Sequence, residues 1–412
     1  MKAKILGVAA SLRNARWGIG PEKLIKDIQE IKTQKSLFEF LQKEADIHLN
    51  QFVEAGRKDG IPFDQLYGNL RRKRSESGLS NSEIILAAAL WAARQNGAEI
   101  DYLSLTDHFS MTREVRNQEA LKEKLLQADG ILLSTPVYFG DRGSLAHDFI
   151  EIIKADDELV RSFSEKVYGG LAVGAKRNGG QETTLIYQLL DMVNLGSFGV
   201  GNDSESTSQY GGTSHAGDVG TGAKDTYGLN TSIGTGKRVA SIANLLQAGE
   251  THQLKNKARI QFWILQDHED KAENLLKKII LESKTLCNPE IINLTSAEIK
   301  RCIACDICPT HIDIDEIYRC IIHKSPLDEL ETHHAKFVDV DAIIPVVYSG
   351  KDMETRQSNY QRFIERTRYL RRGDYLFTNV LTAPLVFEEV ETQENMHIRM
   401  LTSMIRHHTI LV

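Results

Sequence analysis

Short apolar segments alternate with helical segments along this chain, and this alternation restricts its possible folds more than any other feature. Residues 4–9, KILGVA, form a short apolar run that ends in small residues, which predicts a buried strand. Further strands are predicted at 99–105, 130–134 and 167–173, and helices from Ser80 and over about 117–127 and 143–153. Strands that alternate with helices are typical of a parallel sheet covered by helices, so the sequence predicts the α/β class.

The same alternation begins again in the second half of the chain. Strands are predicted at 259–265, 290–294, 342–347 and within 375–386, and helices at 270–284, 359–370 and about 394–411. The segment PVYFGDRGSLAHDFIEII (136–153) aligns with PVVYSGKDMETRQSNYQRFIERT (345–367), which indicates one architecture used twice. We therefore predict two doubly wound parallel-sheet domains, 1–255 and 256–412, of which the second is a derived copy.

Two segments of the first half depart from the alternation. Residues from about 21 to 75 are charged and have apolar residues at helical spacing, so we expect a helical insertion over about 18–77. Residues 169–236 hold 16 of the 30 glycines, and we expect a long functional loop region there, closed by a helix over 236–247.

Composition excludes several classes of protein. The formal net charge is −6, so general affinity for nucleic acid is not expected. The longest strongly apolar stretch is about 84–93, which is too short for a membrane span of ~20 residues. The apolar run at the N-terminus is also too short for a signal peptide, so we expect a cytoplasmic protein without a membrane span.

Hydroxyl and amide side chains gather where a phosphate could bind. Ser11, Leu12 and Arg13 directly follow the first strand, and the sequence SNSE begins a helix with Ser80, Asn81 and Ser82. Helix N-termini with exposed N–H groups suit a phosphate. Ser and Asn at such positions also serve simply as helix caps, and this alternative applies to each residue taken alone.

Two more loops are predicted at the carboxyl ends of strands, where open α/β sheets bind ligands. The first follows the third strand, and its residues are Pro136, Val137, Tyr138, Phe139 and Gly140. The second, GAKRNGGQE (174–182), follows the next strand, and the adjacent Gly179 and Gly180 allow backbone groups to approach a flat ring.

These segments resemble the NADPH-dependent FMN reductase and iron–sulfur flavoprotein group of flavodoxin-like proteins. That group has a Ser-x-Arg loop continuing to Ser-Asn-Thr, a Pro-x-Tyr-x-Gly segment and a Gly-Gly-Gln loop, in this order. The segment DTYGLNTSIGTG (225–236) also resembles the group's segment before its last helix. The likeness covers most of residues 1–250, although the insertion splits the phosphate loop and Ser82 stands in place of Thr.

The resemblance implies that both domains are flavodoxin-like and that the first binds FMN. Its phosphate would be held by Ser11, Arg13, Ser80, Asn81 and Ser82. The flavin ring would lie near Pro136, Val137, Tyr138, Phe139, Gly140, Gly179 and Gly180. The corresponding first loop of the second half, residues 266–270, holds three carboxylates that would repel a phosphate, so we expect one FMN per chain.

A cysteine cluster marks the second half. Cys302, Cys305 and Cys308 have CxxCxxC spacing and Cys320 follows, which is compatible with the four thiolate ligands of a [4Fe–4S] cluster. A zinc site and free or redox-active thiols are the alternatives. Relatives in the group carry a compact cysteine cluster after the second strand, and their fourth cysteine comes sooner than Cys320 does here.

The sequence thus predicts an FMN-dependent oxidoreductase. NAD(P)H or another donor would reduce the flavin, and electrons would pass to a small-molecule or protein acceptor, through a [4Fe–4S] cluster if one exists. Because the flavin supplies the chemistry, no catalytic side chain is assigned. The alternative is a non-enzymatic flavin electron carrier or assembly protein with the second domain as a docking module. The group usually forms dimers or tetramers. This implies either that the chain forms a homo-oligomer or that the two domain copies within one chain imitate such a dimer.

Overall fold

The chain consists of two compact units, Met1–His252 and Gln253–Val412, which we call unit 1 and unit 2. The computed structural model describes residues 2–13, 21–72, 78–112, 114–203, 209–250, 256–283, 286–305, 308, 320–322, 328–351, 353–371, 375–389 and 394–412.

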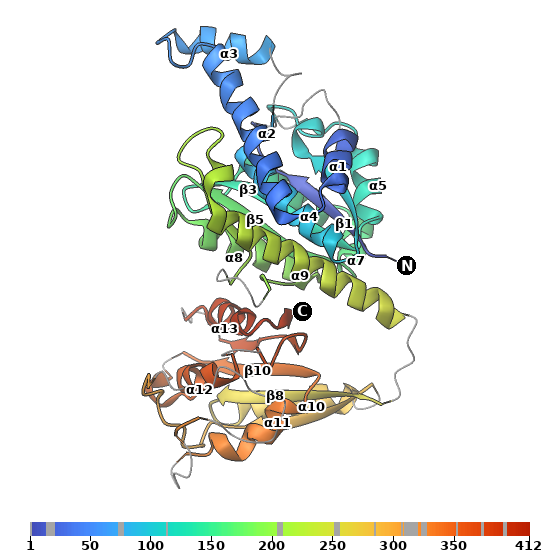
Figure 1. Ribbon diagram of the computed structural model, residues 1–412. Coiled ribbons are helices and arrows are strands. Elements are labelled where there is room, and N and C mark those ends of the chain that lie inside the picture. The colour runs from blue at the N-terminus through green and yellow to red at the C-terminus, as the bar shows by residue number, and fades with distance from the viewer. Residues whose placement is uncertain are drawn as a thin grey trace. The chain divides into compact units, whose positions relative to one another are not determined.

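Unit 1 is built on a parallel sheet (Figure 1). Its strands are β1 (Lys4–Ala9), β2 (Glu99–Ser104), β3 (Gly130–Tyr138), β5 (Val167–Gly174), β6 (Phe198–Gly199) and β7 (Gly212–His215), and the short β4 (Asp141–Arg142) forms an antiparallel hairpin with β3. The main strands lie in the order β2-β1-β3-β5, with β6 and β7 pairing along β5. Counting the main strands along the chain gives the order 2-1-3-4-5 of flavodoxin-like sheets, so the predicted α/β class is confirmed.

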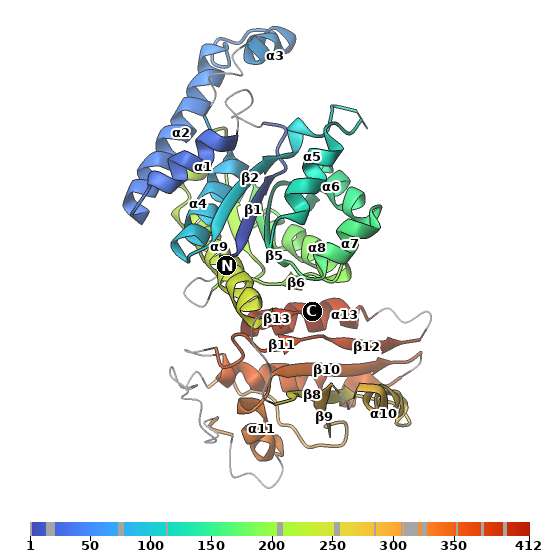
Figure 2. The same ribbon diagram turned by 90° about the vertical axis from the view of Figure 1, so that its right-hand side faces the viewer.

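Helices cover both faces of this sheet. They are α4 (Asn81–Gln95), α5 (Gln118–Leu126), α6 (Ser144–Lys154), α7 (Asp157–Phe163), α8 (Gln181–Asn194) and α9 (Thr226–Glu250). Figure 2 shows α4 and α9 on one face and the other four helices on the opposite face. A Cβ atom on Gly236 of α9 would lie 2.0 Å from the backbone oxygen of Ala89 in α4, so glycine is what allows these two helices to pack so closely.

The predicted insertion is helical. It contains α1 (Pro21–Glu30), α2 (Gln34–Glu54) and α3 (Phe63–Arg72), and α1 and α2 pack against α4. The Trp91 indole of α4 donates a hydrogen bond of 3.2 Å to the Ile31 carbonyl, which fastens the insertion to the domain. Within the described residues of both units, no helix is long and apolar enough to cross a membrane.

The expectation of a long loop over residues 169–236 is wrong. That segment contains the end of β5, all of α8 and β7, and the first turns of α9, which begins at Thr226 rather than at Gly236. Its glycines are required by close packing rather than by loop flexibility. A Cβ on Gly169 would lie 2.5 Å from the Val239 side chain, and one on Gly212 would lie 2.5 Å from Leu171.

Unit 2 repeats the strand order of unit 1. Its strands are β8 (Ala258–Gln266), β9 (Cys287–Asn293), β10 (Ala342–Ser349), β11 (Leu381–Thr382), β12 (Leu385–Glu388) and β13 (Ile410–Leu411). They lie in the order β9-β8-β10-β11-β13, with β12 also pairing with β10, and all pairs are parallel. The helices are α10 (Lys271–Ser283), α11 (His334–Val338), α12 (Tyr360–Arg366) and α13 (Met396–Met404), with 3₁₀ turns η6 (Thr367–Leu370) and η7 (Ile405–His407) after the last two.

Alternating residues of β8 build the two faces of the unit 2 core. Phe262 and Ile264 pack in one cluster with Leu276 of α10. Trp263 points to the other face, where its ring stacks on Phe337 with centroids 4.3 Å apart. The helix expected over 394–411 is wrong at its end, because the chain leaves the helix after α13 and forms β13.

Candidate functional site

The loops of unit 1 that carry the predicted site residues all leave the carboxyl edge of the sheet. The parallel pairing of β1, β3, β5 and β7 places the ends of these strands at one edge. Loops at this edge bind the ligands of open α/β sheets. Hydrogen bonds and close backbone approaches join the loops to one another, as described below.

The first loop is connected to the start of α4 through the end of β3. The Ala10 N–H donates to the Ser134 carbonyl over 2.8 Å, and the Ser134 hydroxyl donates to the Ser82 carbonyl over 2.8 Å. The Ser11 hydroxyl accepts from the N–H of Arg13 over 3.3 Å, which turns the chain directly after β1. These contacts bring Ser11, Arg13 and Ser82 into one region.

Ser80 has a structural task in this region. Its hydroxyl accepts from the Glu83 N–H over 3.4 Å, and the Glu83 carboxylate accepts from the Ser80 N–H over 2.9 Å, which is a complete capping box. The Tyr102 hydroxyl donates to the same carboxylate over 2.6 Å, and burial beside the Glu83 charge raises the pKa of Tyr102. The helix-cap alternative therefore describes the Ser80 side chain.

Asn81 joins α4 to the loop between β7 and α9. Its amide nitrogen donates to the Asp218 carbonyl, and its amide oxygen accepts from the Gly222 N–H, each over 3.0 Å. The Ser82 hydroxyl, by contrast, has no hydrogen-bond partner within the described residues, although Ser82 is only 3% exposed. Of the three side chains at the α4 start, Ser82 is therefore the one left available to a ligand.

The Arg13 guanidinium gives this region a positive charge. Burial, and then the Arg13 charge, lowers the pKa of His48 in α2 to about 4, so this imidazole is neutral near pH 7. The Asp218 pKa is also lowered, first by the hydrogen bond from Arg57 and further by Arg13. Helix α2 of the insertion thus lies beside the first loop. The Nδ1 atom of its His48 side chain has no hydrogen-bond partner in the described part of the chain.

The β3–β4 hairpin presents two aromatic side chains to solvent. Tyr138 is 55% exposed and Phe139 is fully exposed. Phe139 has φ +52° and the next residue, Gly140, has φ +82°. A left-handed backbone is uncommon for a bulky residue and is often found at ligand sites. An ion pair of 2.7 Å between Arg142 and Asp191 attaches the hairpin to α8.

The loop between β5 and α8, residues 175–180, follows the fourth main strand, and we call it the fourth loop; it touches the hairpin through glycine. Gly180 has φ +97°, and a Cβ on it would lie 2.7 Å from the Cα of Gly140. The Gln181 side chain shapes the loop, because its oxygen accepts from the Gly179 N–H over 2.8 Å and its nitrogen donates to the carbonyls of Lys176 and Ser214. Gly140, Gly179 and Gly180 are therefore close together, as the ring site requires.

One ion-pair network at this edge was not found by sequence reasoning. Asp225 accepts from the Ser214 hydroxyl over 3.0 Å and from the His215 N–H over 2.8 Å, and it pairs with Arg177. Burial would raise the Asp225 pKa, but these hydrogen bonds and Arg177 lower it below its usual value. The Arg177 guanidinium also lies 4.7 Å from the centroid of the Tyr227 ring. Arg177 lies inside the motif GAKRNGGQE, and Asp225 lies inside the motif DTYGLNTSIGTG. Their place in these motifs was the signal in the sequence that could have identified them.

The equivalent edge of unit 2 is already occupied by a carboxylate of the chain. Asp267 accepts hydrogen bonds from the N–H groups of His268, Ala272 and Glu273 over 2.7, 2.8 and 3.1 Å. These N–H groups, at and just before the start of α10, are the donors that a phosphate would need. This geometry agrees with the expectation that unit 2 lacks a flavin phosphate site.

The four cysteines proposed as metal ligands, Cys302, Cys305, Cys308 and Cys320, are half-buried. Within the described residues, no three His, Cys, Asp or Glu side chains are arranged to hold a metal ion. The chain between Cys308 and Cys320 lies outside the described residues. Metal ligation by these cysteines stays a prediction.

Comparisons with known proteins agree with the geometry of unit 1. The family described as NADPH-dependent FMN reductase matches residues 66–205. An iron–sulfur flavoprotein of Methanocaldococcus jannaschii is 32% identical over 182 residues, which are 40% of this chain and 92% of that protein. An iron–sulfur flavoprotein of Methanosarcina thermophila is 28% identical over 181 residues, covering 40% of this chain and 90% of that protein.

Solved structures give weaker likenesses. A flavodoxin-like, WrbA-like protein of Agrobacterium tumefaciens is 20% identical, with a TM-score of 0.30 over 39% of this chain and 88% of that one. The structure of RosB with a bound flavin intermediate is 14% identical, with a TM-score of 0.36 over 76% of this chain and 99% of that one. Scores this low carry no argument, so the relationship stands on the sequence matches.

Proposed function

The chain belongs to the NADPH-dependent FMN reductase family of flavin-dependent oxidoreductases, and we propose that it binds one FMN at the carboxyl edge of the unit 1 sheet. One observation carries this proposal. Loops that are far apart in sequence are held together there by direct contacts, from Ala10 through Ser134 to Ser82, and from Gly140 to Gly180. The same loops carry the family's motifs.

The phosphate end of the proposed site lies at the first loop and the α4 start. Arg13 supplies a positive charge, and the Ser82 hydroxyl supplies a hydrogen-bonding group without another partner in the described chain. The N-terminus of α4 adds its partial positive charge. Ser80 and Asn81 support this end indirectly, because their side chains hold the helix start and the neighbouring loop in place.

The ring end of the proposed site lies between the hairpin and the fourth loop. Gly140 and Gly180 approach each other without side chains, so their backbone groups can lie against a flat ring. The exposed Tyr138 and Phe139 can cover its edge and exclude water. FMN bound there would supply the hydride and electron transfer, so the chain's own residues bind and orient rather than exchange protons.

We propose NAD(P)H as the electron donor, and a small molecule or a protein as the acceptor. The family description supports the donor. A [4Fe–4S] cluster on the four cysteines would make single-electron transfer available, and the names of the two archaeal relatives support it. Apart from these cysteines, no residue of the described chain is assigned to single-electron transfer.

Titration of the apo form of the full chain with FMN, followed by quenching of flavin fluorescence, tests the phosphate assignment. Replacing Ser82 with Ala removes one hydrogen bond to a charged group and should weaken FMN binding about tenfold or more. Ser241→Ala is the matched control, because Ser241 is an exposed serine of α9 that bonds only to Lys237 within its own helix. Arg13→Gln should also weaken binding.

The two variants decide the assignment together. If Ser82→Ala and Arg13→Gln both bind FMN as tightly as the parent chain, the phosphate lies elsewhere and the proposed site is wrong. If the parent chain oxidises NADPH with a quinone or a nitro compound in the presence of FMN, the donor assignment is supported. Failure to oxidise either NADPH or NADH would contradict the donor assignment.

A further inference from the structure

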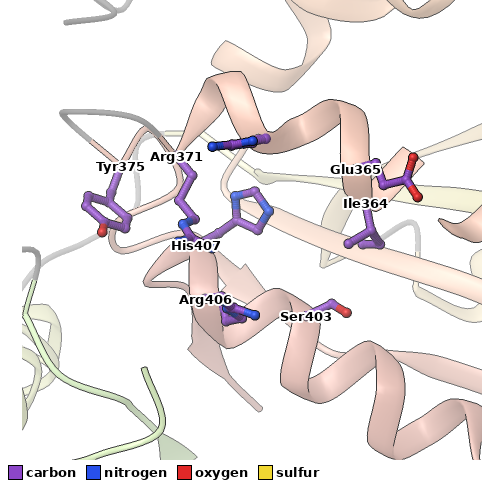
Figure 3. A pocket seen from close by; sticks show the side chains of 8 residues that line it. Ile364, Glu365, Arg371, Tyr375, Ser403, Arg406 and His407 are labelled. Atoms are coloured by element: carbon purple, nitrogen blue, oxygen red, sulfur yellow. The ribbon is translucent and has the colours of Figure 1, made fainter. Parts of the chain in front are cut away.

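Unit 2 contains a cavity that the flavin site does not use. Its volume is about 600 Å³, which is within the usual range of small-molecule sites. Helix α12 with the turn η6, and helix α13 with the turn η7, supply most of its wall (Figure 3). Turn η7 ends at His407 and β13 begins at Ile410, and η6 is the last helical turn before β11 in the described chain. The cavity therefore lies toward the amino ends of these strands, whereas a flavodoxin-type ligand binds at the carboxyl ends.

The wall of this cavity is positively charged. Arg368, Arg371 and Arg406 line it, and Glu365 is the one carboxylate among the lining residues that the structure describes. Burial lowers the pKa of Arg371, and the charges of Arg406 and Arg368 lower it further. Guanidinium groups that repel one another in a partly buried space are stabilised by an anion placed between them.

A buried histidine forms part of the cavity wall. His407 is only 4% exposed and lines the cavity beside Arg371, as Figure 3 shows. Its Nε2 atom lies 3.3 Å from the Thr367 hydroxyl, and this hydroxyl donates to the Ile364 carbonyl over 3.0 Å. Nε2 is therefore assigned as the protonated nitrogen.

That assignment leaves the other nitrogen of His407 as a hydrogen-bond acceptor. Nδ1 is buried and has no hydrogen-bond partner within the described residues. Burial, and then the neighbouring Arg371, lowers the pKa of His407 to about 3, so the ring is neutral near pH 7. Nδ1 is enclosed by protein atoms, so His407 contributes a neutral ring to the wall, and the ligand that fits the cavity has an anionic group for the arginines.

We propose that this cavity binds a phosphorylated sugar or a nucleotide. The phosphate lies between Arg371 and Arg406, and the organic part of the ligand occupies the remaining volume of the cavity. The Ser403 hydroxyl and the Tyr375 ring, which stacks on His408 at 3.8 Å, complete the wall. The cavity is lined by residues of unit 2, whereas the proposed FMN site belongs to unit 1, and the proposal does not require bound FMN.

A purely structural role for the arginines predicts something different. Cations near the C-terminal ends of helices are stabilising. Arg371 directly follows η6, and Arg406 lies within η7. Removing them would then destabilise unit 2 and leave any binding unaffected. Under the binding proposal, removing one of several like charges leaves the unliganded chain at least as stable as before.

Calorimetric titration of the full chain, loaded with FMN, tests the proposal with ribose 5-phosphate, AMP, inorganic phosphate and sulfate as probes. Ribose 5-phosphate or AMP should bind at least about tenfold more tightly than sulfate. Arg371→Gln and Arg406→Gln should each weaken that binding about tenfold or more. Arg356→Gln is the matched control, because Arg356 is an exposed arginine of unit 2 outside the cavity, and it should leave binding unchanged.

The melting temperatures of the unliganded variants separate the two roles. Values equal to or above that of the parent support the binding role. If Arg371→Gln does not fold, Arg371→Lys and Arg406→Gln provide the same comparison. The proposal is overturned if no organic phosphate binds better than sulfate, or if both arginine variants bind as the parent does. Equal binding of inorganic phosphate and ribose 5-phosphate would overturn the assignment of an organic phosphate as the ligand.

Discussion

Gly180 and Gly140 approach each other so closely that a Cβ on Gly180 would lie 2.7 Å from the Cα of Gly140. These residues are 40 positions apart in the chain and belong to the two loops that the sequence assigns to the flavin ring. The contact makes the shape of the ring site depend on glycine at a defined position, and it leads to the first prediction.

Gly180→Ala should weaken FMN binding at least about tenfold. Its φ of +97° is strained for alanine, by about 1–3 kcal/mol, and the added methyl group displaces the Gly140 loop. Flavin fluorescence titration measures the effect. Gly249→Ala is the control, since a Cβ there meets no atom within 4 Å and alanine is favoured inside a helix. Equal affinity of the two variants would show that the ring lies elsewhere.

Ser80→Ala should lower stability in the presence and absence of FMN alike. The substitution removes one half of the capping box and should cost about 0.5–2 kcal/mol. Thermal unfolding with and without FMN measures this. A loss of stability that appears only with FMN bound would mean that the Ser80 hydroxyl contacts the flavin phosphate after all.

The neutral His48 should make the chain less stable in mild acid. Its pKa is lowered from 6.5 to about 4 in the folded chain, so the unfolded chain binds a proton first as pH falls. The contribution of neutral His48 to the free energy of unfolding is fully present above pH 6.5. This contribution is lost as the pH falls toward 4, and the total loss is about 3 kcal/mol. Melting temperatures of the parent and of His48→Gln between pH 7.5 and 5 give the comparison. Identical pH dependence of the two proteins would contradict this role.

Arg366 and Asp328 should hold the cysteine segment of unit 2 in place. Their side chains are each 1% exposed and form a bidentate ion pair. Arg366 also donates to the carbonyls of Lys300 and Ile322, and Asp328 accepts from the Lys300 N–H over 2.9 Å. Both flanks of the segment that carries Cys302 to Cys320 are thus attached to one buried pair.

Asp328→Ala leaves a buried guanidinium without its carboxylate and should cost about 3–5 kcal/mol. The thiols of the segment should then react faster with a maleimide. Glu354→Ala, which breaks an exposed pair with Arg356, is the control and should cost less than about 1 kcal/mol. If thiol reactivity is the same in both variants, the buried pair does not hold the segment.

The fold was predictable from the sequence where local pattern and tertiary packing agree. The strand at Lys4–Ala9 and the helix after Ser80 are as predicted, because an apolar run and a capping box determine them locally. Helix α8 was missed, because the many glycines of residues 169–236 were interpreted as the sign of one long loop. Gly169 and Gly212 instead lie in strands, where they allow side chains of other elements to pack closely, and this depends on partners far away in the chain.

The candidate site was predictable as a set of loops but not as a set of contacts. The motifs placed Ser82, Gly140 and Gly180 at one edge of the sheet. They could not reveal that Arg177 pairs with Asp225, or that His48 of the insertion lies near Arg13. Each of these relations depends on the three-dimensional arrangement of residues separated by many positions.

The stoichiometry of FMN binding tests the central claim most directly. The full chain is purified without oxygen, freed of flavin and titrated with FMN while flavin fluorescence is recorded. We predict one FMN per chain, with the binding weakened by Gly180→Ala and Ser82→Ala. Binding of two FMN per chain would contradict the conclusion that Asp267 fills the equivalent place in unit 2, and absence of binding would contradict the proposed function itself.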